Sequence, residues 1–119
     1  MGSTILMLDL PLPKSPPHKR MKAKYNAVPT EREREYHLWL IDAFPCACGC
    51  GRASTVVHHP LIRHPEQRWR RDHEFVVPMD GGCHMELHRA GNERKFRPSI
   101  CFAEKAYGFR ARGYDQGFL

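Results

Sequence analysis

Four histidines in two short segments have the spacing of a metal site. His84 and His88 are four residues apart in a segment that predicts a helix, so both imidazoles lie on one helix face and can bind one ion. His58 and His59 end a segment that predicts a strand. Because neighbouring residues of a strand point to opposite sides, one of them can join the ion while the other faces a substrate water. Three imidazoles leave one coordination position open, which is typical of catalytic sites.

The helical motif differs from that of zinc proteases. Those enzymes use H-E-x-x-H, in which a glutamate follows the first histidine. Here the order is His84-Met85-Glu86-Leu87-His88, and Glu86 is not on the face that the two histidines share. The pattern therefore disfavours a protease.

Cysteines form a second group of possible ligands. Three of them lie in a tight knuckle before the predicted strand, and Cys83 lies at the start of the predicted metal-binding helix. The count of five cysteines is odd, and clustered thiols in a reducing compartment favour metal ligation over disulfides. Structural zinc takes four ligands. We therefore expect either two knuckle thiolates with Cys83 and Asp80, or all three with Cys83. The knuckle cysteines are Cys46, Cys48 and Cys50.

The elements that position these residues follow from local signals. Thr30 and Glu33 predict a capping box for a helix that ends at about Ala43, before Pro45. Strands are expected over 54–59 and 73–79, a basic loop over 60–71, and helices over 81–90 and 99–107, with Gly91 and Gly108 ending the two helices. The apolar side of the first helix is expected to be Tyr36, Leu38, Trp39 and Leu40. Cys101 is expected in the core of the last helix.

Length and charge restrict the class of protein. The chain has 119 residues, enough for one small domain, and a formal net charge of +6, which favours a nucleic-acid partner. Residues 1–29 are rich in proline and basic side chains and predict a flexible arm with room for a short strand over 4–8, whereas 30–119 predict the folded domain. No run of about 18 apolar residues and no basic signal-peptide start is present, so we expect a cytoplasmic protein without a membrane partner.

These motifs resemble those of the HNH (ββα-metal, His-Me finger) endonucleases, and among them the short phage-encoded proteins related to recombination-enhancement (Ref-type) nucleases. The likeness covers roughly residues 30–110. The His-His pair followed by H-x-x-x-H is also similar to the nuclease domain of DNase colicins. The matching segments are 44–46, 57–60, 75–79, 83–89, Phe102 and 107–108.

The resemblance implies a small α+β fold with a zinc-stabilised ββα-metal core and flanking helices. It implies that His58, His84 and His88 bind the catalytic ion and that His59 is the general base. The middle residue of the signature, which would orient that base, falls at Asp72, His73 or Glu74, and we favour His73 or Asp72. The chain departs from the family in its cysteines, since the usual C-x-x-C pairs are replaced by C-x-C-x-C and by Asp80-Gly-Gly-Cys83.

The implied activity is hydrolysis of phosphodiester bonds in nucleic acid, with DNA favoured, by one divalent ion (Mg, Mn, Zn or Ni) beside a structural zinc. A phage or host recombination protein would be a partner, in a bacterial or phage-infected cell. Two alternatives are a zinc-stabilised nucleic-acid-binding module without catalysis and a metal-binding structural subunit. Basic residues of the loop are candidates for phosphate contacts. They are Arg63, Arg68, Arg70 and Arg71.

Overall fold

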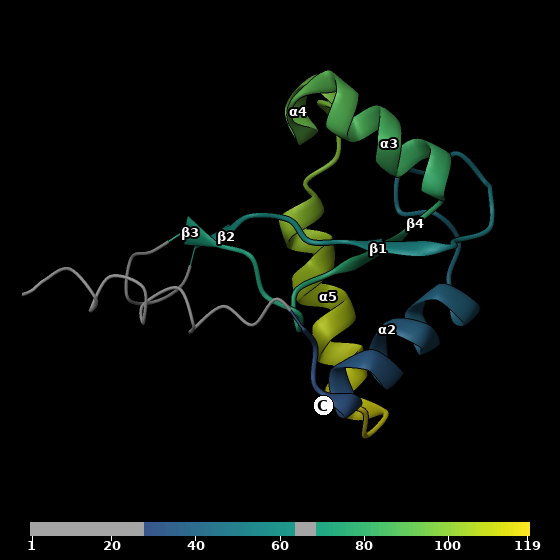
Figure 1. The fold of residues 1–119 in the computed structure, drawn as a ribbon, viewed down its shortest axis with the longest axis vertical. Helices are drawn as coiled ribbons and strands as arrows, with labels where there is room; N and C mark the ends of the chain where they lie inside the picture. The colour runs from purple at the N-terminus through teal and green to yellow at the C-terminus, as the bar shows by residue number, and fades with distance from the viewer. Residues whose placement is uncertain (1–27, 64–68) are drawn as a thin grey trace, which may run out of the picture.

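The computed structural model of this chain describes residues 28–63 and 69–119, apart from the side chains of residues 69 and 70. The described part is a small α+β arrangement of helices and two pairs of short antiparallel strands (Figure 1). The expected basic arm, including its strand over 4–8, lies outside the described residues except at its last two positions. Within the described part, no helix is both long enough and apolar enough to cross a membrane.

Helix α2 (Glu31–Ala43) confirms the predicted capping box. The Thr30 hydroxyl accepts from the backbone N–H of Glu33, and the Glu33 carboxylate accepts from the backbone N–H of Thr30. The helix buries Tyr36 and Leu40, whereas Leu38 is 60% exposed. The expectation for Leu38 was wrong because its position lies about 200° around the helix from Tyr36. His37 is buried in its place.

The central strand pair joins β1 (Val56–His58) to β4 (Val77–Met79), with His58 opposite Val77. A second pair joins β2 (Ile62–Arg63) to β3 (Trp69–Arg70). This second pair lies in the segment that was expected to be a loop. Two-residue strands carry too little periodicity to be recognised in a sequence.

Helix α3 (Gly81–Ala90) has its predicted limits, and Gly91 caps it with a φ of 102°. The short helix α4 (Glu93–Phe96) follows it, and α5 (Phe102–Asp115) ends the fold. The expectation that Gly108 ends the last helix was wrong. A glycine inside a helix costs only about 1 kcal/mol, and α5 continues because it buries residues on both sides of Gly108. Cys101 occupies the N-cap position of α5 without a capping hydrogen bond from its side chain, and it is exposed, which corrects the expectation that it lies in the core.

The alternating side chains of the central strand pair belong to two different buried clusters. Val77 and Met79 pack with Leu87 of α3 and Phe102 of α5. Val57 and Val76, whose side chains point to the other face of the strand pair, pack with side chains of α2. Figure 1 shows α3 above the strand pair and α2 below it. The strand pair therefore carries adjacent residues to two different helices.

Candidate metal centres and pocket

Three groups of side chains in the described residues have the composition and spacing of metal sites. One contains only cysteines and two contain only histidines, and within each group one ligand atom per residue lies within 4.8 Å of the others. All three collect residues from separate elements. The groups are Cys46–Cys48–Cys50–Cys83, His58–His84–His88 and His37–His59–His73.

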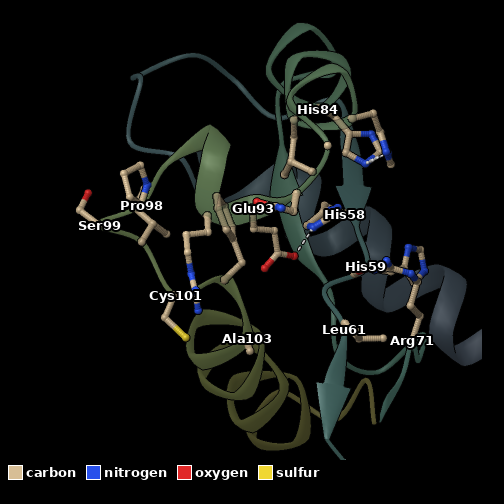
Figure 2. Close-up of a pocket in the computed structure, with 17 residues that line it drawn as sticks. His58, His59, Leu61, Arg71, His84, Glu93, Pro98, Ser99, Cys101 and Ala103 are labelled. Carbon is tan, nitrogen blue, oxygen red and sulfur yellow. Dashed lines mark hydrogen bonds and ion pairs between the residues drawn. The ribbon is translucent and has the colours of Figure 1, made fainter.

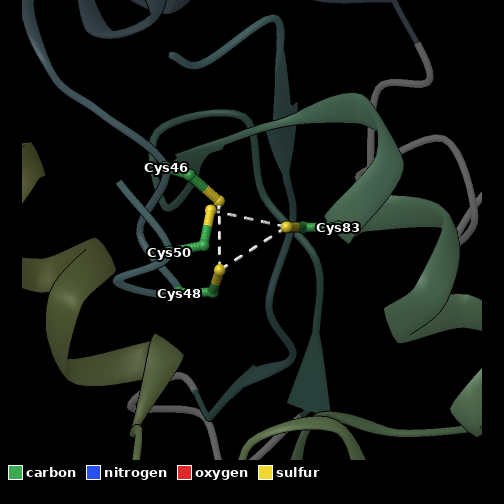
Figure 3. A group of neighbouring side chains, drawn as sticks. All are labelled: Cys46, Cys48, Cys50 and Cys83. Atoms are coloured by element: carbon green, nitrogen blue, oxygen red, sulfur yellow. Dashed lines mark hydrogen bonds between the residues drawn. The ribbon is translucent and has the colours of Figure 1, made fainter. Parts of the chain in front are cut away.

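The cysteine group joins the knuckle after α2 to the first turn of α3 (Figure 3). The Sγ atom of Cys48 lies 3.3 Å from that of Cys46 and 3.6 Å from that of Cys83, and Cys50 lies 3.6 Å from Cys83. All four are free thiols. Zinc–sulfur bonds of about 2.3 Å in a tetrahedron place sulfurs about 3.8 Å apart. The cluster is therefore compatible with a zinc ion, and all three knuckle cysteines take part.

Burial and hydrogen bonding change the pKa values of these thiols. Burial raises the pKa of Cys83, whereas a hydrogen bond from the backbone N–H of Arg52 lowers the pKa of Cys50 to about 7. A cation among the four sulfurs would favour the thiolate form of the buried members as well.

Asp80 caps a helix instead of joining the cysteines as the fourth ligand that one alternative predicted. Its carboxylate accepts from the backbone N–H of Cys83 at 3.1 Å and so caps α3, and it lies 3.7 Å from Nη1 of Arg52. Four thiols are present without it. An aspartate at this position serves as the N-cap of the helix, for which Asp is a preferred residue.

The first histidine group combines the end of β1 with one face of α3. His84 and His88 are one helical turn apart, with their Nε2 atoms 3.1 Å from each other, and the ring centre of His58 lies 5.2 Å from that of His84. Two nitrogens bound to one ion by bonds of about 2.0–2.1 Å lie about 2.8–3.4 Å apart. Burial lowers the pKa of His84 to about 4, so this imidazole is neutral at pH 7 and offers a lone pair. The donor set fits a divalent cation.

Glu93 accompanies this group, and the sequence reasoning missed it. Its Oε2 lies 2.7 Å from Nε2 of His58, which is itself almost fully buried. Glu93 follows Gly91 and Asn92 in a short helix that was not predicted, so no sequence signal linked it to His58. A carboxylate that accepts from one ring nitrogen of a histidine leaves the other nitrogen for a metal.

The second histidine group lies on the other side of the strand pair. His59 directly follows β1, and its Nε2 lies 3.0 Å from Nδ1 of His73. His37 of α2 places its Nε2 2.7 Å from the carbonyl oxygen of His73. Burial, then the nearby His73, lowers the pKa of His59 to about 4, and burial lowers the pKa of His37. His37 was also missed, although a histidine on the buried side of a helix is itself a signal.

The structure brings His73, and not Asp72, to His59. The Asp72 carboxylate accepts from the backbone N–H of Glu74 at 3.0 Å and closes a local turn. The Glu74 carboxylate accepts from Arg110 at 2.8 Å.

A pocket of about 770 Å³ opens beside the two histidine groups. Figure 2 shows His58 between Glu93 and His84, with His59 and Arg71 on the same wall of the pocket. The opposite wall comes from the segment before α5 and from its first turn.

Among the candidate arginines whose side chains the structure describes, Arg71 lines the pocket. Arg71 is exposed there and donates from Nη1 to the carbonyl of His59. Arg63 is exposed on β2, and Arg70 belongs to β3. Arg68 lies outside the described residues. Comparison with known proteins adds no assignment, since no protein-family model, curated protein or solved structure matches this chain.

Proposed function

We propose that this protein is a metal-dependent endonuclease of the HNH class that hydrolyses phosphodiester bonds, with DNA as the favoured substrate. One observation carries the proposal: His59 lies on a pocket wall next to the three-imidazole group formed by His58, His84 and His88. A nuclease of this class needs a base and a cation on adjacent positions. Two antiparallel strands followed by a helix, β1, β4 and α3, support a ββα-metal core.

In this proposal His59 is the general base. Two bare nitrogens 3.0 Å apart would repel, so the His59–His73 pair shares a proton. The Nε2–H group of His59 donates a hydrogen bond to Nδ1 of His73, which leaves Nδ1 of His59 with a lone pair. That nitrogen accepts the proton of a water whose oxygen attacks phosphorus. The bond from phosphorus to the leaving oxygen breaks, and the leaving alkoxide takes a proton from a second water. Because the pKa of His59 is lowered to about 4, the base is unprotonated at pH 7.

The His58, His84 and His88 imidazoles would hold a divalent cation, which would supply a Lewis acid for the phosphate oxygens. Glu93 positions His58 by accepting from its Nε2 proton. The four cysteines would hold a structural zinc, and because they come from the knuckle and from the start of α3, that ion would help to orient the helix that carries His84 and His88.

Charge supports a polyanionic substrate. The chain carries a net charge of +6, and Arg71 places a guanidinium at the pocket beside His59. Such contacts add affinity without reading sequence. We extend the proposal to a recombination protein of phage or host as a partner.

A cleavage assay with His59→Ala tests the proposal. Plasmid, single-stranded DNA and RNA are each incubated with Mg²⁺, Mn²⁺, Zn²⁺ or Ni²⁺. We expect the wild type to cut at least one substrate and His59→Ala to lose about 10²–10⁴-fold of that rate. Ion binding by His58, His84 and His88 should persist in the variant. Leu38→Ala, at an exposed side chain of α2 that does not line the pocket, is the control and should keep full activity.

A wild type that binds nucleic acid but cuts none of the three substrates with any ion would favour the zinc-stabilised binding module. A stable complex with a protein and no affinity for nucleic acid would favour the structural subunit. Full activity of His59→Ala would refute the role of His59.

A further inference from the structure

We propose that His37, His59 and His73 form a second site for a late first-row divalent cation such as Zn²⁺, Co²⁺ or Ni²⁺. The three imidazoles come from α2, from the residue after β1 and from the segment before β4. One ring nitrogen from each lies within 4.8 Å of the other two. Imidazole is a ligand that these cations prefer.

The spacing of the His59 and His73 nitrogens agrees with a shared ion. The His59–His73 distance of 3.0 Å is within the range of about 2.8–3.4 Å for two nitrogens on one cation. The His84–His88 pair of the first group has nearly the same separation, 3.1 Å. His37 and His73 are buried and His59 is half-buried, so the ligands lose little freedom when they bind.

The second site is distinct from the first because the strand separates them. His58 and His59 are neighbours in the chain, but His58 faces His84 and Phe102, whereas His59 faces His37 and His73. The ring centres of His37 and His59 are 5.9 Å apart at an angle of 87°. Two cations would thus lie on opposite sides of the same dipeptide.

Occupation of this site would have a consequence that rests on the proposed function. A cation on Nε2 of His59 takes the place of the proton that His59 shares with His73. A neutral imidazole bound at Nε2 carries its proton on Nδ1, and a protonated Nδ1 cannot accept a proton from water. Excess cation would therefore inhibit hydrolysis by changing the tautomer of His59.

Cobalt stoichiometry tests the site without any cleavage. The zinc-loaded wild type is dialysed against Co²⁺, and bound metal is counted. We expect two equivalents beyond the thiolate-bound zinc, and one fewer in His37→Gln, whose amide still donates to the His73 carbonyl. His84→Gln should lose the other equivalent. Glu86→Gln, at an exposed glutamate of α3 outside all three groups, should bind as the wild type does.

An unchanged count in His37→Gln would overturn the site, and so would an equal loss in Glu86→Gln. Ring ¹⁵N resonances of the wild type during a Zn²⁺ titration give a result that does not depend on variant folding. Shifts of His37, His59 and His73 support the site, and shifts confined to His58, His84 and His88 overturn it. If only the second group shifts, this inference stands and the metal site of the proposed function fails.

Discussion

The contact between Glu93 and His58 predicts how strongly the first histidine group binds its cation. Glu93 Oε2 is 2.7 Å from Nε2 of His58, and the two side chains are 29% and 4% exposed. The carboxylate holds the ring in one orientation and one tautomer, and it makes the other nitrogen more basic. Substitution of Glu93 should therefore weaken cation binding although Glu93 is not itself in the ligand group.

The expected magnitude follows from the kind of contact that is lost. Removing the outer partner of a metal-binding histidine costs about 10–100-fold in affinity, or about 1.4–2.7 kcal/mol. Glu93→Gln keeps an oxygen that can accept from His58 but removes the charge, so we expect the cation affinity to fall about tenfold. Glu93→Ala removes both and should reach about 100-fold. Because the pair has low exposure, water does not easily replace the carboxylate, and we expect the loss of affinity without a reduction for solvent screening.

A Zn²⁺ titration followed through the ring ¹⁵N resonances of His88 measures this affinity at the group concerned. Glu86→Gln is the matched control, because Glu86 is an exposed glutamate on α3 beside the same ligands. Thermal unfolding monitored by circular dichroism shows whether each variant is folded. Equal affinity of Glu93→Ala and the wild type would refute the positioning role of Glu93.

Two further pairs of substitutions test the cysteine group and the packing of α5. Cys83→Ser should lose the bound zinc and fail to fold. Structural zinc contributes about 10–16 kcal/mol to such sites, whereas whole domains are stable by only about 5–15 kcal/mol. The control Cys101→Ser, at an exposed cysteine outside the group, should keep its zinc. Zinc content and circular dichroism decide this, and a folded, zinc-loaded Cys83→Ser would contradict it. Gly113→Ala places a Cβ 2.6 Å from the buried Tyr36 ring and should cost about 1–3 kcal/mol. Gly108→Ala enters open space and should gain about 0.5–1 kcal/mol, so urea unfolding that shows both variants stabilised would count against the described packing.

Local signals predicted those elements whose ends are set by neighbouring residues. Helix α2 begins at the Thr30 capping box and α3 ends at Gly91, and both were expected at these positions. A cap is a hydrogen bond or a backbone angle within a few residues, so its signal is contained in the sequence. The end of α5 and the exposure of Cys101 were predicted wrongly. Both depend on which face of the last helix is buried by other elements.

The sequence by itself determined which residues could do chemistry and one geometric relation among them, the shared helix face of His84 and His88. Only the tertiary structure decided which side chain or carbonyl each histidine contacts. His59 meets His73 across 14 positions, His58 meets Glu93 across 35, and His37 meets the His73 carbonyl across 36. Contacts over such separations depend on how strands and helices pack, and packing is decided by the burial of the whole set of apolar side chains. No spacing within one segment encodes them.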